Sequence, residues 1–264
     1  MKVGIIGMGY VGKAVQASWL GAEHSVIYYD PNVAGSADSV EAVVAERPGV
    51  IFVCVPTPSA EDGACDVSIV KETIDKILGN YAGIVIVKST VNPDFWADYD
   101  NHNNLFHVPE FLVANSAVTD YLNPKFIFIG GHKDQSYQVL RILQLSTVRM
   151  SVPVYCTDLI TASLVKYFMN TFLATKVTVL NQFKQLSNAI GADWHEFTEM
   201  IEMDERMGTS HNQVPGPDGQ YGYGGACFPK DVRAIIDRIQ THGVSAGIIE
   251  AVDTANTQFR GITL

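Results

Sequence analysis

The sequence predicts an α/β protein in which a doubly wound parallel sheet is followed by a helical domain with a long central helix. Short apolar stretches alternate with helical patterns over the first 150 residues, as in parallel sheets covered by helices on both faces. Apolar residues then recur at helical spacing from Leu159 to Ile190. We therefore expect two domains, residues 1–150 and 151–264.

The chain opens with an apolar strand, a glycine turn and a helical pattern that continues to Leu20. The turn reads Gly7-Met-Gly-Tyr-Val-Gly12. In a Rossmann-type fold the first glycine permits a tight turn, the second leaves room for a pyrophosphate, and the third lets the helix pack on the strand. The residues that we expect to bind a dinucleotide here are Gly7, Gly9, Tyr10, Val11 and Gly12.

A second apolar strand, from Ser25 to Tyr29, ends on Asp30. A carboxylate at this place can accept hydrogen bonds from a ribose. The stretch from Pro31 to Asp38 contains no lysine or arginine that could pair with the 2′-phosphate of NADP. The expected cofactor is therefore NAD.

Further strands are predicted at 50–55, 84–88, 105–108 and 126–130, with helices at 67–78 and 135–145 between them. Ligands of such sheets bind at the carboxyl ends of the strands. The polar residues at three of these ends are Thr57, Thr90 and Glu110. A helix cap or turn explains either threonine equally well. Glu110 is a candidate general base, and an exposed turn acid is the alternative.

The second half begins with a connecting stretch at 150–158 and continues into the helix from Leu159 to Ile190. This helix is too long and too apolar to lie alone on a surface, so we expect it to pack against a second subunit of a homodimer. Lys166 and Asn170 lie one turn apart on it. Together they could hold a developing oxyanion, or they could be an unrelated solvated pair.

A shorter helix is predicted at 194–203, and a long loop at 204–225 follows it. Loops of this length in compact domains are usually functional or disordered, and the polar and aromatic side chains here favour sugar contacts. Two last helices are predicted at 229–240 and 245–259.

One cysteine stands where that loop meets the next helix, in Gly222-Tyr-Gly-Gly-Ala-Cys-Phe-Pro-Lys-Asp231. Pro229 suits the first turn of a helix, which puts Cys227 at or just before the helix start. Unpaired amides, the helix dipole and Lys230 favour a thiolate there, and Asp231 adds a carboxylate within one turn. A small buried hydrophobic cysteine is the alternative.

Composition excludes some classes of partner. The 28 acidic and 18 basic residues give a net charge of −10, which argues against binding to nucleic acid or an anionic membrane surface. The four cysteines form no C-x-x-C pair and no cluster with histidines, so we expect reduced thiols and no metal. The sequence has no basic leader and no apolar run of membrane-spanning length, so a cytoplasmic protein is expected.

Taken together, the motifs resemble the UDP-glucose/GDP-mannose dehydrogenase family over nearly the whole chain. They are Gly7-Met-Gly-Tyr-Val-Gly12, Val55-Pro-Thr-Pro58, Lys88-Ser-Thr-Val91, Pro109-Glu-Phe-Leu112, Lys166-x-x-x-Asn170 and Gly224-Gly-Ala-Cys-Phe-Pro-Lys-Asp231. The resemblance implies a two-step oxidation of the C6 alcohol of a nucleotide sugar to a carboxylate, with two NAD⁺ and a thioester on Cys227.

The resemblance also implies roles for single residues. Lys166 and Asn170 would stabilise the oxyanion, and Asp231 would assist as a base through water. Thr90 and Glu110 would organise the hydrolytic water. The expected cofactor contacts further include Pro56, Thr57, Thr90 and Lys230. The expected substrate contacts are Glu110, Phe111, Leu112, Lys166, Asn170, Arg206, Tyr223, Gly224 and Gly225, with Arg206 matching an arginine that reaches the substrate across a dimer.

Three features depart from the family pattern. The chain stops near the point where a C-terminal nucleotide-binding domain usually begins, and the segment after Asp30 is short. Val113-Ala114 stands where a second acid commonly follows the Pro-Glu-Phe-Leu motif. The identity of the hexose and the way in which UDP is held therefore stay open.

Two other functions compete with this one. A single-step 3-hydroxyacid-type dehydrogenase would also combine a Rossmann-type domain with Lys-x-x-x-Asn on a long helix, but it leaves Cys227 without a role. A non-catalytic or partner-dependent module that binds NAD and a sugar is favoured by the expected absence of a C-terminal domain.

Overall fold

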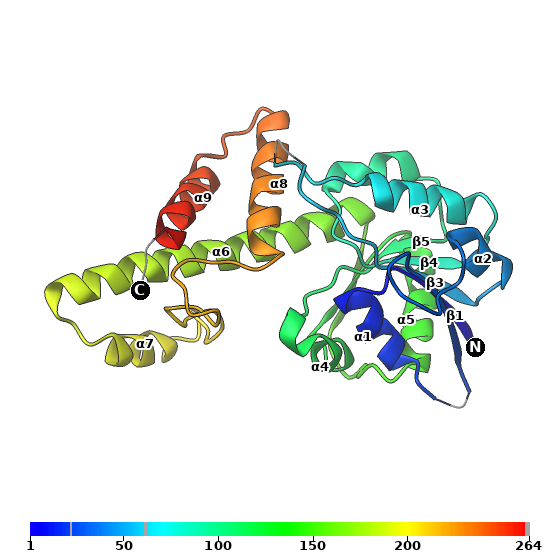
Figure 1. Ribbon diagram of the computed structural model, residues 1–264, viewed down its shortest axis with the longest axis horizontal. Helices are drawn as coiled ribbons and strands as arrows, with labels where there is room; N and C mark the ends of the chain where they lie inside the picture. Colours follow the sequence, from blue (N-terminus) through cyan, green and yellow to red (C-terminus); the bar gives the residue numbers. More distant parts are fainter. Residues whose placement is uncertain (22, 61–62, 262–264) are drawn as a thin grey trace. The chain divides into compact units, whose positions relative to one another are not determined.

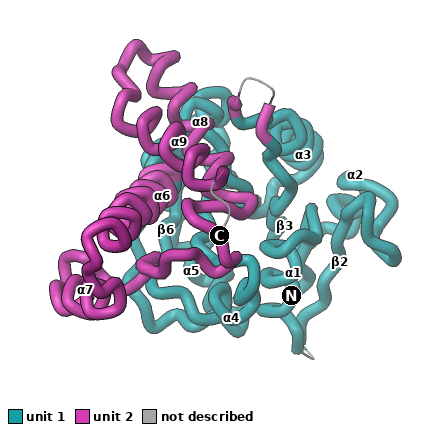
Figure 2. The backbone as a smooth tube through the Cα atoms, turned by 60° about the vertical axis from the view of Figure 1, so that its left-hand side comes forward, with its two compact units in different colours: residues 1–58, 65–166 teal, residues 59–64, 167–264 magenta. Residues whose placement is uncertain are grey.

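The computed structural model describes residues 1–21, 23–60 and 63–261 of the 264-residue chain. The chain forms two compact units, coloured teal and magenta in Figure 2. Unit 1 takes in Met1–Pro58 and Cys65–Lys166, and unit 2 takes in Ser59–Ala64 and Tyr167–Leu264. The domain boundary expected between residues 150 and 151 stays a prediction. Unit 1, which is defined by compactness, extends past it to residue 166.

Unit 1 is built on a seven-stranded sheet with the strand order β2-β1-β3-β4-β5-β6-β7. The strands are β1 (Lys2–Ile6), β2 (Ser25–Tyr29), β3 (Val50–Val53), β4 (Ile84–Val87), β5 (Leu105–His107), β6 (Ile127–Gly130) and β7 (Val154–Thr157). The neighbours from β2 to β5 pair in parallel, as do β6 and β7. The predicted α/β fold is confirmed.

The sheet departs from the expected all-parallel arrangement at one place. β6 pairs with β5 in the antiparallel direction, with His107 opposite Gly130. An antiparallel neighbour needs no crossover over the face of the sheet, so the chain after β5 can turn back beside the same strand. Close packing at the end of β6 admits only glycine at residue 130, because a Cβ there would lie 2.9 Å from the carbonyl oxygen of Asp158.

Residues of the central strands alternate between the two faces of the sheet, because successive side chains of a strand point in opposite directions. Helices α1 (Tyr10–Ser18), α4 (Ala117–Leu122) and α5 (Ser136–Leu145) cover one face, and α2 (Val40–Ala45) and α3 (Ser68–Leu78) cover the other (Figure 1). The first face buries Val3, Ile5, Val50, Phe52, Ile84 and Ile86. The second buries Ile6, Ile51, Val53, Val85 and Val87.

Short elements account for most differences from the predicted secondary structure. The stretch 150–158, expected to be a connection, contains the edge strand β7, in which Tyr155 is 68% exposed. Helix α2, helix α4 and the 3₁₀ helices η1 (Pro93–Tyr99), η2 (Ala114–Ser116) and η3 (Lys133–Gln135) were not predicted either. Such short elements depend on tertiary contacts more than on their own periodicity.

Unit 2 is helical. It contains most of α6 (Leu159–Ile190), then α7 (Trp194–Glu202), α8 (Phe228–Thr241) and α9 (Gly247–Arg260). The long helix is therefore confirmed, and its first eight residues belong to unit 1. The buried core of unit 2 contains Ala174, Val177, Tyr223, Val232 and Val252. Asp193 caps α7 by accepting from the backbone N–H groups of His195 and Glu196.

Candidate functional site

The glycine turn joins β1 to α1. Gly7 has a φ of 92°, which favours glycine, and a Cβ there would lie 2.6 Å from the carbonyl oxygen of Cys54. A Cβ at Gly12 would overlap the carbonyl oxygen of Gly7. At Gly9, by contrast, a Cβ would meet no described atom within 4 Å. Close packing thus requires glycine at residues 7 and 12, and the space beside Gly9 can admit a phosphate.

The start of α1 and the end of β2 complete this part of unit 1. No side chain of the described residues caps the first turn of α1, so its amides can donate to an anion. The Asp30 carboxylate accepts from the N–H of Met8 at 2.7 Å and from the N–H of Asn32 at 2.9 Å. A carboxylate keeps free lone pairs after two such bonds, so Asp30 can also accept from ribose hydroxyls. These residues fit the pyrophosphate and one ribose of NAD.

Tyr10 and Val11 differ in their environment at the start of α1. The Tyr10 side chain is 66% exposed, whereas Val11 is half-buried against the core on the α1 side of the sheet. Tyr10 is therefore free to contact a ligand, and Val11 mainly positions the turn.

Polar residues gather at the carboxyl ends of β3, β4 and β5, as the sequence predicts. Thr57 is buried and Thr90 is half-buried. Ser89 donates its hydroxyl to the carbonyl of Val55 at 2.7 Å, which joins two of these strand ends. The Nζ of Lys88 lies 3.0 Å from Oε2 of Glu110. The sequence indicated Glu110, but it did not indicate that a lysine holds it.

Lys166, at the end of unit 1, has a well-defined environment. Its side chain is buried, and its Nζ lies 4.8 Å from the centroid of the Phe111 ring. Phe111 packs in turn against Phe126 and Phe128. Leu112, the next residue, is half-buried against the same core as α1. The Lys166 ammonium thus lies over an aromatic ring that is itself packed against two others.

The cysteine loop in unit 2 ends at the start of α8, where the sequence places it. Cys227 is the N-cap residue and is exposed, and Pro229 stands within the first turn. The backbone N–H of Asp231 donates to the carbonyl of Cys227 at 2.9 Å. The thiol is therefore accessible at a helix start, and the reading of Cys227 as a buried hydrophobic residue does not apply.

Asp231 lies at the centre of a buried polar group. Its carboxylate is almost fully buried, and Oδ2 accepts from the amide of Asn170 at 2.6 Å. Oδ1 lies 2.6 Å from Nζ of Lys230. Asn170 is thus paired with a carboxylate on α8, so a solvated asparagine is excluded. The Lys230 charge, which was expected to favour the Cys227 thiolate, is directed to Asp231.

Two buried asparagines hold the glycine loop that leads to Cys227. Asn181 of α6 accepts from the N–H of Gly222 at 2.9 Å. Asn256 of α9 accepts from the N–H of Tyr223 at 2.7 Å and donates to its carbonyl at 3.1 Å. Arg260 donates to the same carbonyl at 2.9 Å. Motif spacing did not identify these residues, because each lies on a helix far from the loop in sequence.

The glycines of this loop differ in their surroundings. A Cβ at Gly224 would overlap the guanidinium of Arg260, whereas a Cβ at Gly225, which has a φ of 77°, would meet no described atom within 4 Å. Tyr223 is buried in the unit 2 core, and burial raises its pKa. Tyr223 therefore anchors the loop, and Gly225 provides its open edge.

The preceding loop is ordered by Lys176 of α6. Its Nζ donates to the carbonyls of Met207, Gly208 and Ser210 at 2.8, 3.2 and 2.6 Å. The exposed guanidinium of Arg206 pairs with Asp204 in the same loop. Arg206 is therefore available at the surface of unit 2, and its contact with a substrate stays a prediction.

The predicted site residues divide between the two units. Unit 1 holds Gly7, Gly9, Tyr10, Val11, Gly12, Asp30, Pro56, Thr57, Thr90, Glu110, Phe111, Leu112 and Lys166. Unit 2 holds Asn170, Arg206, Tyr223, Gly224, Gly225, Cys227, Lys230 and Asp231. Within unit 1 the structure pairs Glu110 with Lys88, and within unit 2 it joins Asn170, Lys230 and Asp231.

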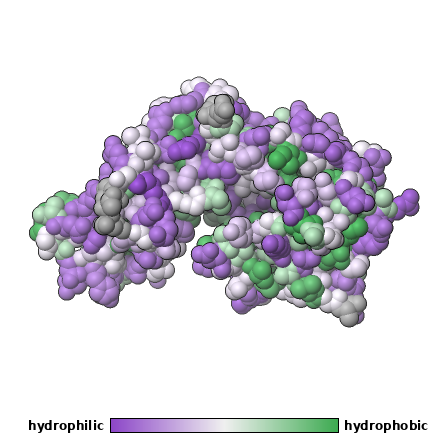
Figure 3. Space-filling view, viewed as in Figure 1, coloured by the Kyte–Doolittle hydropathy of each residue, from purple (hydrophilic) through white to green (hydrophobic). Residues whose placement is uncertain are grey.

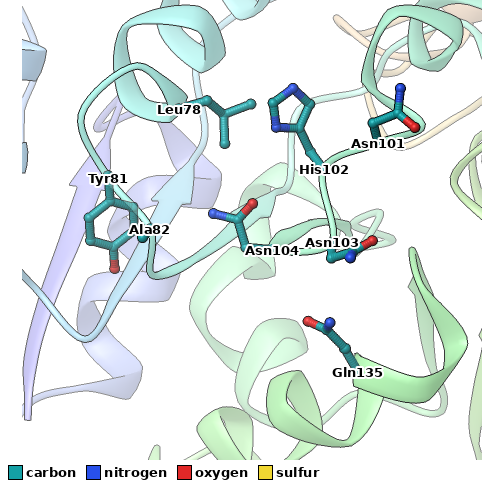
Figure 4. Close-up of a pocket in the computed structure, with 8 residues that line it drawn as sticks. All are labelled: Leu78, Tyr81, Ala82, Asn101, His102, Asn103, Asn104 and Gln135. Carbon is teal, nitrogen blue, oxygen red and sulfur yellow. The ribbon is translucent and has the colours of Figure 1, made fainter.

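Two cavities lie at the opposite, amino edge of the unit 1 sheet. One, of about 380 Å³, is lined mainly by amides, and Figure 4 shows Asn103, Asn104 and Gln135 around it. The other, of about 720 Å³, is lined by residues that include Arg47, Lys76 and Tyr81. Because the strand-end motifs are at the carboxyl edge, we do not assign either cavity to the candidate site.

The residues that the structure describes also bear on metal sites and membrane-spanning helices. Among them, no group of three or more His, Cys, Asp or Glu side chains could hold a metal ion. In residues 1–21, 23–60 and 63–261, none of the helices combines the length and apolar character needed to cross a membrane. Hydrophilic residues cover most of the face seen in Figure 3, with hydrophobic patches between them.

Comparison with known proteins identifies both halves of the chain. Residues 32–145 match the NAD binding domain model of the UDP-glucose/GDP-mannose dehydrogenase family, and residues 160–258 match its central domain model. NAD is accordingly the cofactor of the Rossmann-type unit.

Individual relatives agree with these models. A UDP-glucose 6-dehydrogenase of Rickettsia felis is 34% identical over 79% of this chain and 47% of its own length. The chain thus spans about half the length of the curated relatives that it matches first. The solved UDP-glucose dehydrogenase of the archaeon Pyrobaculum islandicum is 26% identical, with a TM-score of 0.82 over 97% of this chain and 68% of that one.

A solved 3-hydroxyisobutyrate dehydrogenase from Mycobacterium tuberculosis has the same fold. Its TM-score is 0.77 over 98% of this chain and 93% of that one, at 18% identity. At this identity the likeness concerns the fold alone.

Proposed function

Because the chain belongs to the UDP-glucose/GDP-mannose dehydrogenase family, we propose that it is an NAD-dependent nucleotide-sugar 6-dehydrogenase. Its proposed reaction oxidises the C6 alcohol of a UDP-hexose, or of a smaller activated sugar, to a carboxylate. The observation that carries the proposal is the exposed Cys227 thiol at the start of α8, one turn from the buried pair of Asp231 and Asn170.

NAD, when bound, supplies the hydride acceptor for both oxidations. The protein supplies the nucleophile: the Cys227 thiolate attacks the aldehyde carbon and forms a carbon–sulfur bond, which gives a thiohemiacetal. Its oxidation leaves a thioester on Cys227. Water then adds to the thioester carbonyl, the carbon–sulfur bond breaks, and the carboxylate product and the thiol are released with one proton.

Other residues stabilise and orient the reacting groups in this proposal. Lys166 and Asn170 donate hydrogen bonds to the developing oxyanion. Asp231 accepts from the Asn170 amide, which fixes the orientation of that amide, and it assists proton transfer through water. Thr90 and Glu110 orient the hydrolytic water. Arg206 and the backbone of Gly224 and Gly225 are proposed to contact the substrate.

The stoichiometry of the reaction tests the proposal. We expect two NADH for each acid formed, measured by absorbance against product analysis. Cys227→Ala should abolish acid formation, and Cys156→Ala, at an exposed cysteine of β7, should not. Full turnover of the Cys227→Ala variant would remove the thioester from the account.

The single-step 3-hydroxyacid-type reaction stays the second candidate, because the chain combines a Rossmann-type unit with Lys166 and Asn170 one turn apart on the long helix α6. It predicts one NADH for each product and no dependence on Cys227. Calorimetry separates both enzymes from a non-catalytic module. Binding of NAD with no binding of UDP-glucose or a hydroxyacid, and no turnover, would support the module.

We further propose that the protein is a homodimer that acts in the cytoplasm. In unit 2, one side of α6 exposes apolar residues, which are Phe168, Phe172, Val179, Phe183, Leu186 and Ile190. Their spacing of three, four or seven residues places them in one stripe, which a second copy of the same helix could cover. All four cysteines are free thiols, as expected in a reducing compartment.

A further inference from the structure

Lys88 and Glu110 form an enclosed ion pair at the carboxyl edge of the unit 1 sheet. Nζ lies 3.0 Å from Oε2, and the two side chains are only 5% and 16% exposed. The Lys88 ammonium also lies 5.3 Å from the centroid of the Tyr121 ring. The other oxygen of Glu110, Oε1, accepts from the N–H of Phe111 at 2.9 Å. Two contacts thus fix the carboxylate, and each oxygen keeps a lone pair for a ligand.

Three titratable groups near this pair are neutral at pH 7, namely Cys54, Tyr121 and His107. Enclosure of the Cys54 thiol raises its pKa to about 12, and burial raises the pKa of Tyr121. Burial, with the nearby charge of Lys88, lowers the pKa of His107 to about 3. Lys166, over Phe111, is the second ammonium of this region. Lys88 is therefore the cation in direct contact with Glu110.

We propose that Lys88 is a positioning residue that holds Glu110 as an ionised carboxylate, ready to accept a hydrogen bond from water or from a sugar hydroxyl. The inference rests on the proposed function, in which the ionised carboxylate of Glu110 orients the hydrolytic water. Val113-Ala114 follows the Pro-Glu-Phe-Leu motif where a second acid is common. An ion pair with Lys88 would let Glu110 act without that second acid.

Removing the ammonium should change the state of Glu110. A largely enclosed carboxylate is costly when its paired cation is removed. Loss of the ammonium favours the protonated form of Glu110, and a protonated carboxyl donates a hydrogen bond where the ionised one accepts. The loss should be reversed at higher pH, where the proton is released.

The test is the pH dependence of turnover in Lys88→Met, with UDP-glucose and NAD as substrates. We expect kcat to fall by roughly 100-fold near pH 7, at the lower end of the usual effect of one acid–base group, and to recover as the pH rises. Lys88→Arg, which keeps the charge, should keep the wild-type pH profile. Lys71→Met removes a lysine from an exposed ion pair and should behave as wild type. An equal loss at every pH would overturn the proposal.

A second measurement does not need activity. Carbon-13 NMR of protein labelled at the glutamate carboxyls, with Glu110→Gln to assign the signal, reports the ionisation of Glu110. We expect the Glu110 signal to report a larger protonated fraction in Lys88→Met than in the wild type at the same pH. An ionised Glu110 in both proteins would refute the role of Lys88. If the wild type shows no turnover but the NMR result holds, the proposed function fails and the role of Lys88 in fixing the carboxylate stands.

Discussion

At the scale of single residues, the side-chain amide of Asn256 bonds to the backbone of Tyr223 in the way that a neighbouring strand would. The backbone N–H and the backbone carbonyl of Tyr223 both bond to this one buried side chain. Asn256→Ala leaves a buried N–H without its acceptor, so we expect the free energy of unfolding to fall by about 1–3 kcal/mol in urea titrations. Thr254→Ala, on the exposed side of α9, should change it by less than about 0.5 kcal/mol. Equal effects of the two changes would contradict this account.

His107 predicts a pH dependence of stability. Its ring is fully buried, with Nδ1 3.1 Å from the hydroxyl oxygen of Ser163, and its pKa is lowered from 6.5 to about 3. Below about pH 6.5 the unfolded chain binds a proton at this residue and the folded protein does not. The free energy of unfolding should therefore fall by up to ~1.4 kcal/mol per pH unit as the pH drops from about 6.5 toward 3.

The variant His107→Asn should remove this contribution and flatten the slope measured by urea unfolding between about pH 6.5 and 5.5. His132→Asn, at an exposed histidine, is the control and should leave the slope unchanged. An unaltered slope in His107→Asn would show that the histidine is protonated in the folded protein.

At the scale of elements, the end of α2 carries a residue in an unfavourable conformation. Arg47 follows the helix with a φ of 47°, in the left-handed region where glycine is preferred. Arg47→Gly should raise the free energy of unfolding by about 0.5–1 kcal/mol, measured by thermal or urea unfolding. Ala45→Gly, at the last residue of the same helix, should lower it by up to about 1 kcal/mol. Destabilisation by both changes would mean that the Arg47 side chain contributes more than its backbone costs.

The spacing of apolar residues predicted those elements whose buried side chains form a regular apolar pattern in the sequence. The strands of the central sheet are apolar on both faces, and α6 repeats its apolar residues over many turns. β7 has no such signal, because an edge strand can leave Tyr155 exposed. The 3₁₀ helix η1 holds Phe95 and Trp96 in the core through contacts with distant segments, which a local pattern does not contain.

For the candidate site too, features with a local sequence signal were predicted and features that depend on distant contacts were not. Motifs located Cys227, Asp231 and Glu110, because their neighbours in sequence define the turns that position them. The partners that hold these turns were not predicted from the sequence, since Asn181 and Asn256 approach the cysteine loop only after the helices of unit 2 have packed.

At the scale of the whole molecule, the apolar stripe of α6 predicts the oligomeric state. A charge at Phe172, which is 59% exposed, should be costly in a dimer interface and nearly neutral in a monomer. Phe172→Asp should therefore give a monomer in analytical ultracentrifugation with its helix content unchanged. Gln185→Asp, also on α6 but away from the stripe, should leave the dimer intact. A monomeric wild type would end the proposal.

The clamp formed by Asn256 and Arg260 has a consequence for protein engineering. A side chain at Gly224 requires the Arg260 guanidinium to leave the adjoining space, where it donates to Asp218 and Gln220. Substitutions at these two positions should therefore be strongly non-additive, so that shortening Arg260 rescues a change at Gly224 that is harmful alone. Libraries that vary Gly224 in the cysteine loop should therefore vary Arg260 of α9 together with it.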